Sequence, residues 1–178
     1  VPGSPTAGHL ILNGGTLLAN STFTLNSNRG INLNSNSNVE VADTFSLSYD
    51  GIIAGNRDLT KLGLGTFLLS GASSYSGDTK INAGTLQTTG TLGDTTDVSV
   101  ATGAVYDVDA SDTIQTLSGA GSIELASGIT LTTGDTTTKT ISGVISGPGN
   151  LTKAGSGTLT LSGTNTFTGV TTISAGKL

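Results

Sequence analysis

Residues 51–86 read GIIAGNRDLTKLGLGTFLLSGASSYSGDTKINAGTL, and residues 143–178 read GVISGPGNLTKAGSGTLTLSGTNTFTGVTTISAGKL. The second stretch follows the first at a constant offset of 92 residues without a gap, and 18 of the 36 aligned positions are identical. A degenerate echo over 117–134 repeats the pattern Gly-x-Gly-[Thr/Ser]-apolar-x-Leu. Long internal repeats of this kind predict stacked, equivalent coils, because one coil alone cannot bury its apolar face.

Each copy contains short segments with a period of two. Leu159 and Leu161 alternate with hydroxyl side chains, which places both leucines on one face of a strand. The step from Ile173 to Leu178 changes parity at Gly176, and a corner at that glycine would keep both flanking strands facing inward. We therefore expect strands that meet at glycine-containing corners.

The rest of the chain shows the same alternation. Residues 31–41, INLNSNSNVEV, place four apolar side chains on one parity and asparagines on the other. No stretch has a helical period with caps. Further strands are predicted near 10–18, 22–25, 44–48, 97–101, 104–108, 113–117 and 129–133.

Composition favours a solenoid over a sandwich or an antiparallel barrel. Aromatic residues make up 4% of the 178 residues and Trp is absent, which suits a narrow core of Leu, Ile and Val columns. We predict an all-β chain, with residues 1–178 forming one β-solenoid domain or fragment. At roughly 20 residues per coil it would have about eight or nine coils.

Composition also excludes several function classes. There is no Cys for a disulfide, a thiolate metal site or a cysteine nucleophile, and no 18-residue apolar run for a membrane-spanning helix. With a net charge of −5 and only seven Lys and Arg residues, the chain has no electrostatic footprint for nucleic acid or anionic lipid. We expect no nucleic-acid partner and no direct membrane insertion.

The segments 59–86 and 151–178 resemble the passenger-associated transport repeat, also called the autotransporter-associated β-strand repeat. The shared pattern is Leu-Thr-Lys, Gly-x-Gly-Thr-Leu-x-Leu-Ser-Gly, Asn-Thr-Tyr-x-Gly and Thr-x-Ile-x-Ala-Gly-x-Leu. The second copy matches nearly every position, with Phe167 in the Tyr place, whereas the first departs at Ser73 and Ser74. The resemblance implies an autotransporter passenger domain with a single-stranded right-handed parallel β-helix, the hand that parallel crossovers generally prefer.

The resemblance also implies a secreted or surface-exposed bacterial protein, often an adhesin, and it carries over no catalytic residue. The positions that we assign to the structural repeat are Gly63, Gly65, Leu69, Gly71, Tyr75, Gly77, Ile81, Gly84, Leu86, Gly155, Gly157, Leu161, Gly163, Phe167, Gly169, Ile173, Gly176 and Leu178. Of these, Gly63, Gly65, Gly84, Gly155, Gly157 and Gly176 are expected to mark corners or tight packing sites.

Few residues suggest chemistry. His9 is the only histidine and is expected to be solvated, because a triad or a metal site needs partners beside it. The chain has no compact acid pair for glycan cleavage, so we expect no enzymatic activity and no cofactor. Tyr75 and Phe167 are interpreted as core or corner anchors rather than as a ligand platform.

Two polar patterns leave alternatives open. Calcium could bind the one acidic cluster, although a solvated strand and loop is favoured; the cluster comprises Asp94, Asp97, Asp107, Asp109 and Asp112. Thr-x-Thr pairs, such as Thr130/Thr132 and Thr158/Thr160, could form a hydroxyl array that binds sugars or ice. We favour ordinary outward hydroxyls, because the pairs do not recur at one coil period.

The leading functional prediction is a structural β-solenoid of a bacterial surface protein: a stalk, adhesin or fibre element. The alternatives are a carbohydrate-binding or carbohydrate-cleaving β-helix and, third, an ice-binding solenoid. The expected partners are copies of the chain stacked end to end or the remainder of a longer solenoid, with a host or surface receptor or glycan as a further possibility.

Overall fold

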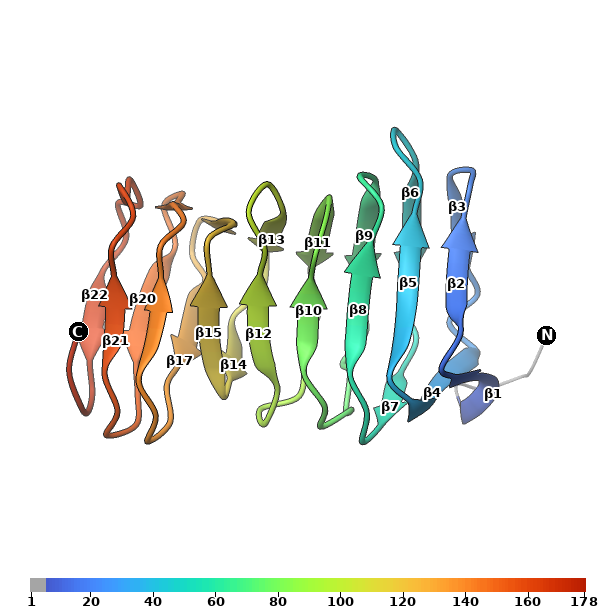
Figure 1. Cartoon of the computed structure of the whole chain (residues 1–178), viewed down its shortest axis with the longest axis horizontal. Coiled ribbons are helices and arrows are strands. Elements are labelled where there is room, and N and C mark those ends of the chain that lie inside the picture. The colour runs from blue at the N-terminus through green and yellow to red at the C-terminus, as the bar shows by residue number, and fades with distance from the viewer. Residues whose placement is uncertain (1–5) are drawn as a thin grey trace.

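The computed structural model describes residues 6–178, which form a rod of 22 strands (Figure 1). Every strand pairing in this part of the chain is parallel, and none of its residues lies in a helix. The all-β parallel solenoid of about eight turns is confirmed. The hand of its winding stays a prediction.

Four sheets run along the rod axis and form its faces. Sheet A contains β1(Thr6–Asn13), β4(Arg29–Ser35) and β7(Ile53–Gly55). Sheet D contains β14(Asp112–Ile114), β17(Thr130–Thr133), β20(Asn150–Lys153) and β22(Thr171–Ile173).

Sheet B is the longest, and its first strands face the viewer in Figure 1. It contains β2(Thr16–Ala19), β5(Ser37–Val41), β8(Leu59–Leu62), β10(Thr79–Ile81), β12(Asp97–Val100), β15(Thr116–Gly119), β18(Lys139–Ile141) and β21(Leu159–Leu161). Sheet C contains β3(Phe23–Leu25), β6(Ser46–Tyr49), β9(Thr66–Leu69), β11(Thr85–Thr88), β13(Val105–Val108), β16(Ser122–Leu125) and β19(Ile145–Ser146).

The chain runs from sheet A or D to sheet B and then to sheet C, except that β21 of sheet B is followed directly by β22 of sheet D. Sheets A and D occupy the same place in this order, but they are not continuous. Sheet A ends at β7 and sheet D begins at β14, because residues 70–78 and 89–96 carry no strand. One face of the rod is therefore interrupted over two consecutive coils.

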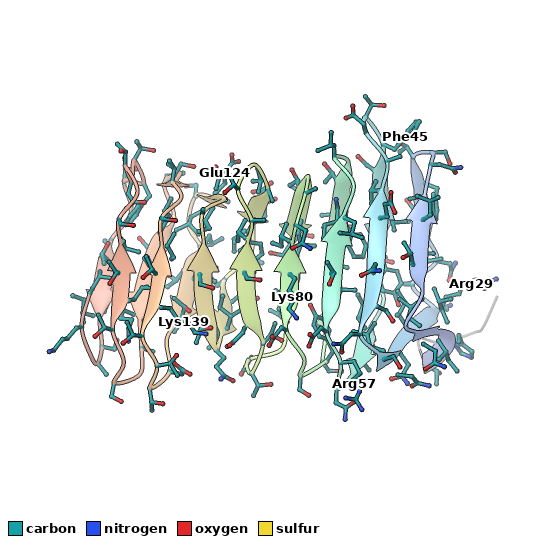
Figure 2. The ribbon with its side chains drawn as sticks, in the orientation of Figure 1. Arg29, Phe45, Arg57, Lys80, Glu124 and Lys139 are labelled. Carbon is teal, nitrogen blue, oxygen red and sulfur yellow. The ribbon has the colours of Figure 1, made fainter. Side chains whose placement is uncertain are left out.

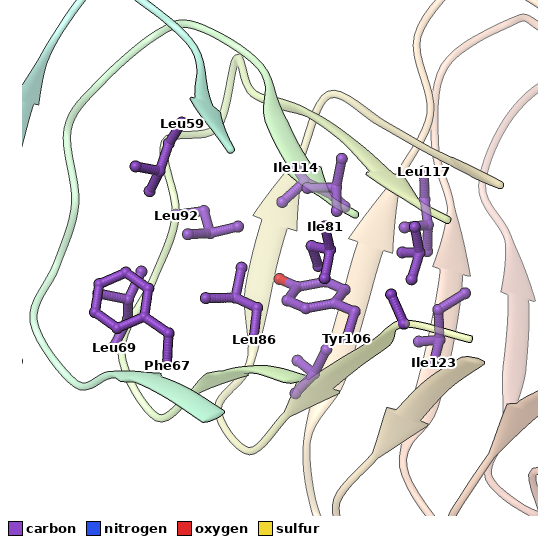
Figure 3. Close-up of a cluster of buried hydrophobic side chains, with 14 of the residues drawn as sticks. Leu59, Phe67, Leu69, Ile81, Leu86, Leu92, Tyr106, Ile114, Leu117 and Ile123 are labelled. Carbon is purple, nitrogen blue, oxygen red and sulfur yellow. The ribbon is translucent and has the colours of Figure 1, made fainter. Parts of the chain in front are cut away.

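The core lies between the sheets and consists of inward-facing aliphatic side chains with a few aromatic ones (Figure 3). The strands alternate buried and partly buried positions, as in β12 and β13. Ile81, Leu86 and Tyr106 are fully buried and converge on the same region of the interior. This is the narrow aliphatic core that the composition predicts.

Some stretches expected to be single strands are two strands with a corner between them. Residues 31–41 form β4 and β5 on either side of Asn36, and 10–18 divides between β1 and β2 at Gly14 and Gly15. The predicted parity is confirmed, since Ile31, Leu33, Val39 and Val41 are all buried. At Asn36 the side chain itself holds the corner: its Oδ1 accepts a hydrogen bond from the N–H of Asp58 in the next coil, at 3.1 Å.

The two long repeats occupy different faces, which corrects the expectation that they form equivalent coils. The Leu-Thr-Lys segment of the first copy lies in β8 of sheet B, and that of the second lies in β20 of sheet D. The following strands β9 and β21 are likewise in sheets C and B. After 92 residues the chain has not completed a whole number of coils and lies one face earlier in the winding. The motif therefore encodes two strands joined by a corner, and these two strands can lie on different pairs of consecutive faces.

Candidate functional site

The repeat glycines lie where consecutive coils approach most closely. At each one, a Cβ atom would stand at most 2.5 Å from a backbone atom of the preceding coil; these glycines are Gly63, Gly65, Gly71, Gly77, Gly84, Gly155, Gly157, Gly163, Gly169 and Gly176. Gly84 also has a φ of +63°, in the left-handed region. It lies between β10 and β11, where the chain turns from sheet B to sheet C.

Tyr75 lies inside the rod on the interrupted face. Its ring is fully buried, and its hydroxyl is 2.6 Å from Oγ1 of Thr79. Phe167, at the matching position of the second copy, packs against the core and is only partly buried. Both aromatics contact core residues, in keeping with the role of core anchors that we propose for them.

The last coil exposes positions that are buried earlier in the rod. Ile173 is 54% exposed, whereas its counterpart Ile81 is fully buried. Leu178 is 43% exposed, and its counterpart Leu86 is fully buried. Leu69 is likewise buried while Leu161 is only partly so. The C-terminal end of this chain therefore presents an apolar, incompletely covered coil.

Two buried lysines were missed by the sequence reasoning. Lys61 and Lys153 close the Leu-Thr-Lys segments, and each is 1% exposed. The ammonium group of Lys61 donates hydrogen bonds to the carbonyls of Leu62, Gly63 and Ala83 at 2.8–3.1 Å. Lys153 donates in the same way to the two residues that follow it. The alternation of the strand could have predicted their burial, because a residue two places after a buried leucine in a strand faces inward as well.

The acidic cluster is divided among three places. Asp97 lies in β12 and pairs with Lys139 at 3.4 Å, near the lower edge of the front sheet in Figure 2. Asp107 lies in β13 on sheet C, and Oδ2 of Asp109 accepts a hydrogen bond from Gln87 at 2.6 Å. Asp94 and Asp112 lie at the break between sheets A and D. Within residues 6–178, no group of three or more acidic or histidine side chains is arranged to hold a metal ion.

A polar hollow of about 340 Å³ opens at that break. Residues from three successive coils line it: Thr91, Asp94, Ser111, Asp112, Thr113, Thr130 and Thr132. Asp112 is 6% exposed, and its carboxylate accepts hydrogen bonds from the N–H groups of Leu92 and Thr113, each at 2.9 Å. It thereby replaces part of the ladder that the missing strand would have supplied.

Single threonines recur at the coil period on sheet D, although the Thr-x-Thr pairs do not. Thr113, Thr132, Thr152 and Thr172 pair in register on four adjacent strands. The column contains one threonine per coil, and the Thr130/Thr132 pair does not continue on the next strand because Thr130 pairs with Asn150. Thr160 belongs to a different face, next to Thr140 on sheet B.

Two other features complete the survey. His9 is exposed, and its Nδ1 lies 3.1 Å from the carbonyl oxygen of Asn28. Over residues 6–178, no helix is long and apolar enough to cross a membrane.

The fold and the repeat positions define a parallel β-solenoid whose corners carry a glycine-rich motif. The family model for the passenger-associated-transport-repeat matches residues 59–88 and 151–178, so the chain contains two passenger-associated-transport repeats.

The chain is also similar to the Adhesin BmaC autotransporter of Brucella suis biovar 1 (strain 1330), with 38% identity over 153 residues. This similarity covers 80% of the chain but only 4% of that relative. No solved structure matches the chain.

Burial of Asp112 should make the fold more stable in mild acid. Burial raises the pKa of its carboxyl to about 6, against the hydrogen bonds from Leu92 and Thr113 and with help from Asp94. A folded pKa above the unfolded one means that the folded state binds more protons between pH 6 and about 4, so acidification stabilises it.

We expect Asp112 to contribute about 1 kcal/mol to the rise in the free energy of unfolding from pH 7 to pH 5, so Asp112→Asn should lose that part of the wild-type rise and keep the part due to Asp107. Urea unfolding at both pH values measures it. Asp107→Asn is the control for the other carboxyl whose pKa burial raises to about 6. An unchanged rise in Asp112→Asn would contradict the assignment.

Proposed function

We propose that this chain is a non-catalytic shaft segment of a secreted or surface-exposed bacterial adhesin. Its two passenger repeats and its similarity to an autotransporter adhesin support this role. A parallel solenoid suits a shaft because each coil hydrogen-bonds to the next along the whole axis, giving a stiff rod from a short repeating unit. The structural repeat positions, in this proposal, serve stacking rather than chemistry.

The exposed last coil is the observation that carries the proposal. Ile173 and Leu178 occupy positions whose counterparts are sealed in the core, so the end surface has the composition of an interior coil. Within residues 6–178, β22 is an edge strand of sheet D, and such edges are normally covered. We propose that a second copy of the chain can cover this surface.

The isolated chain should therefore associate end to end as its concentration rises. A contact between unlike ends does not close on itself, so it propagates into a filament. Light scattering and electron microscopy of the pure chain should show rods that lengthen with concentration, and Ile173→Lys should keep the chain monomeric. Leu64→Lys is the matched control, because Leu64 is 66% exposed but lies in the corner between β8 and β9.

Two outcomes would count against the shaft. Stable wild-type monomers at high concentration would show that the end coil does not accept another coil. Turnover of an acidic polysaccharide, abolished by changing a single aspartate, would replace the structural role with a carbohydrate-cleaving one.

A further inference from the structure

The polar hollow at the break between sheets A and D draws its lining from three successive coils. All seven residues that line it carry a hydroxyl or a carboxyl group. Within the described residues, the lining contains no Lys, Arg or aromatic side chain. A hollow with this lining offers hydrogen-bond acceptors and donors but no cation for an anionic ligand and no aromatic ring for stacking.

Two backbone N–H groups at the hollow are already paired with a side chain, so they are less available to an added β-strand. β14 is the edge strand of sheet D, yet its Thr113 N–H already donates to the Asp112 carboxylate. Leu92 N–H, on the opposite side of the break, donates to the same side chain. With these backbone groups satisfied, an occupant must bind through the side-chain hydroxyls and the accessible carboxylate of Asp94.

The hydroxyl surface continues beyond the hollow. Thr113 and Thr132 line it, and Thr152 and Thr172 extend the same column to the last coil of this chain. Adjacent strands lie about 4.8 Å apart, so this column presents one hydroxyl per step along a straight line. That repeat is close to the length of one sugar unit, which suits a linear glycan lying along the rod axis.

We propose that the hollow binds a neutral, hydroxyl-rich oligosaccharide, with one sugar unit in the hollow and its neighbours along the threonine column. Its volume of about 340 Å³ lies at the lower end of the range for small-molecule sites. Asp94 supplies the acceptor for paired sugar hydroxyls, and Thr130 and Thr132 supply exchangeable donors and acceptors. This inference goes beyond the shaft role and does not depend on it, since it concerns one lateral face.

A titration followed by NMR tests the site on the whole chain carrying Ile173→Lys, the variant that should stay monomeric at the concentrations that NMR needs. The neutral probes are maltotetraose, cellotetraose and triacetylchitotriose, and trigalacturonate is the anionic counterpart. At least one neutral probe should shift the backbone amide signals of Thr113, Thr130 and Thr132, while trigalacturonate shifts none of them. Thr132→Val should weaken binding about fivefold, the loss of one neutral hydrogen bond.

Thr160→Val is the matched control, because it removes the same hydroxyl from sheet B and should change the affinity less than twofold. Valine favours strands as threonine does, and unchanged thermal unfolding of both variants confirms that they fold. The proposal is overturned if no neutral probe shifts these amides, if the shifts spread over all faces, or if they appear with calcium chloride alone. End-to-end association is measured by light scattering rather than by this titration. The sugar-binding proposal and the shaft proposal can therefore fail independently of each other.

Discussion

Replacing Gly84 by valine is expected to lower the free energy of unfolding by about 4 kcal/mol. Two costs add at this corner. A β-branched residue is strained at a φ of +63°, and its Cβ would stand 2.5 Å from the carbonyl oxygens of Gly63 and Gly65 in the preceding coil. Those oxygens belong to backbone, so relief requires two coils to separate. Urea unfolding of Gly84→Val against the wild type measures the loss.

Three alanine variants separate the two costs. Gly103 has a φ of +82° with no atom near its Cβ direction, so Gly103→Ala isolates the backbone strain at about 1 kcal/mol. Gly65 lacks a positive φ but faces backbone of the preceding coil, so Gly65→Ala isolates the steric cost. Gly84→Ala should cost more than either. If Gly84→Ala unfolds at the same urea midpoint as Gly103→Ala, close stacking at this corner is not the cause.

Local patterning made the fold class predictable. The alternation of apolar and polar residues predicted which side chains face inward, such as Val39 and Val41. A glycine at a position where this alternation shifts by one residue predicted a corner. These features act within a few residues, where the physics of a strand or turn is decided. Corners without glycine were missed, because at Asn36 the turn depends on a hydrogen bond to Asp58, 22 residues away.

The placement of the repeats was beyond local reasoning for a different reason. Which face a segment occupies depends on the summed lengths of all preceding coils, and along sheet B successive partners are 19 to 22 residues apart. Because the face of each segment could not be predicted, the threonine column and the hollow could not be predicted either. Asp94, Asp112 and Thr130 come from three coils, and only the accumulated register brings them together.

The buried lysines show how a charged residue can serve the core of a solenoid. β8 ends at Leu62, and the chain turns at Gly63 toward β9. Lys61 places its alkyl stem in the core and its ammonium group on these carbonyls and on that of Ala83 in the next coil. One side chain thus ties two consecutive coils at their corners.

Truncating this side chain should cost about 4 kcal/mol in Lys61→Ala, since it leaves a cavity and unsatisfied buried carbonyls. Lys61→Met keeps most of the volume and should cost about 2 kcal/mol. Denaturant unfolding at pH 7 measures both. Lys80→Met is the control, because Lys80 lies on the outer surface in salt bridges with Asp58 and Asp78 and should cost less than about 1 kcal/mol.

The pH dependence distinguishes a buried ammonium group from simple packing. Burial lowers the pKa of Lys61 to about 8, opposed by the charge of Glu40. Between pH 8 and about 10.5 the unfolded chain keeps the proton that the folded one has lost, so wild-type stability rises with pH in this window. Neither Lys61→Met nor Lys61→Ala can show that rise. The gap in unfolding free energy between wild type and Lys61→Met should therefore widen from pH 7.5 to pH 9.5, and a constant gap would mean that the ammonium group retains its ordinary pKa in the folded rod.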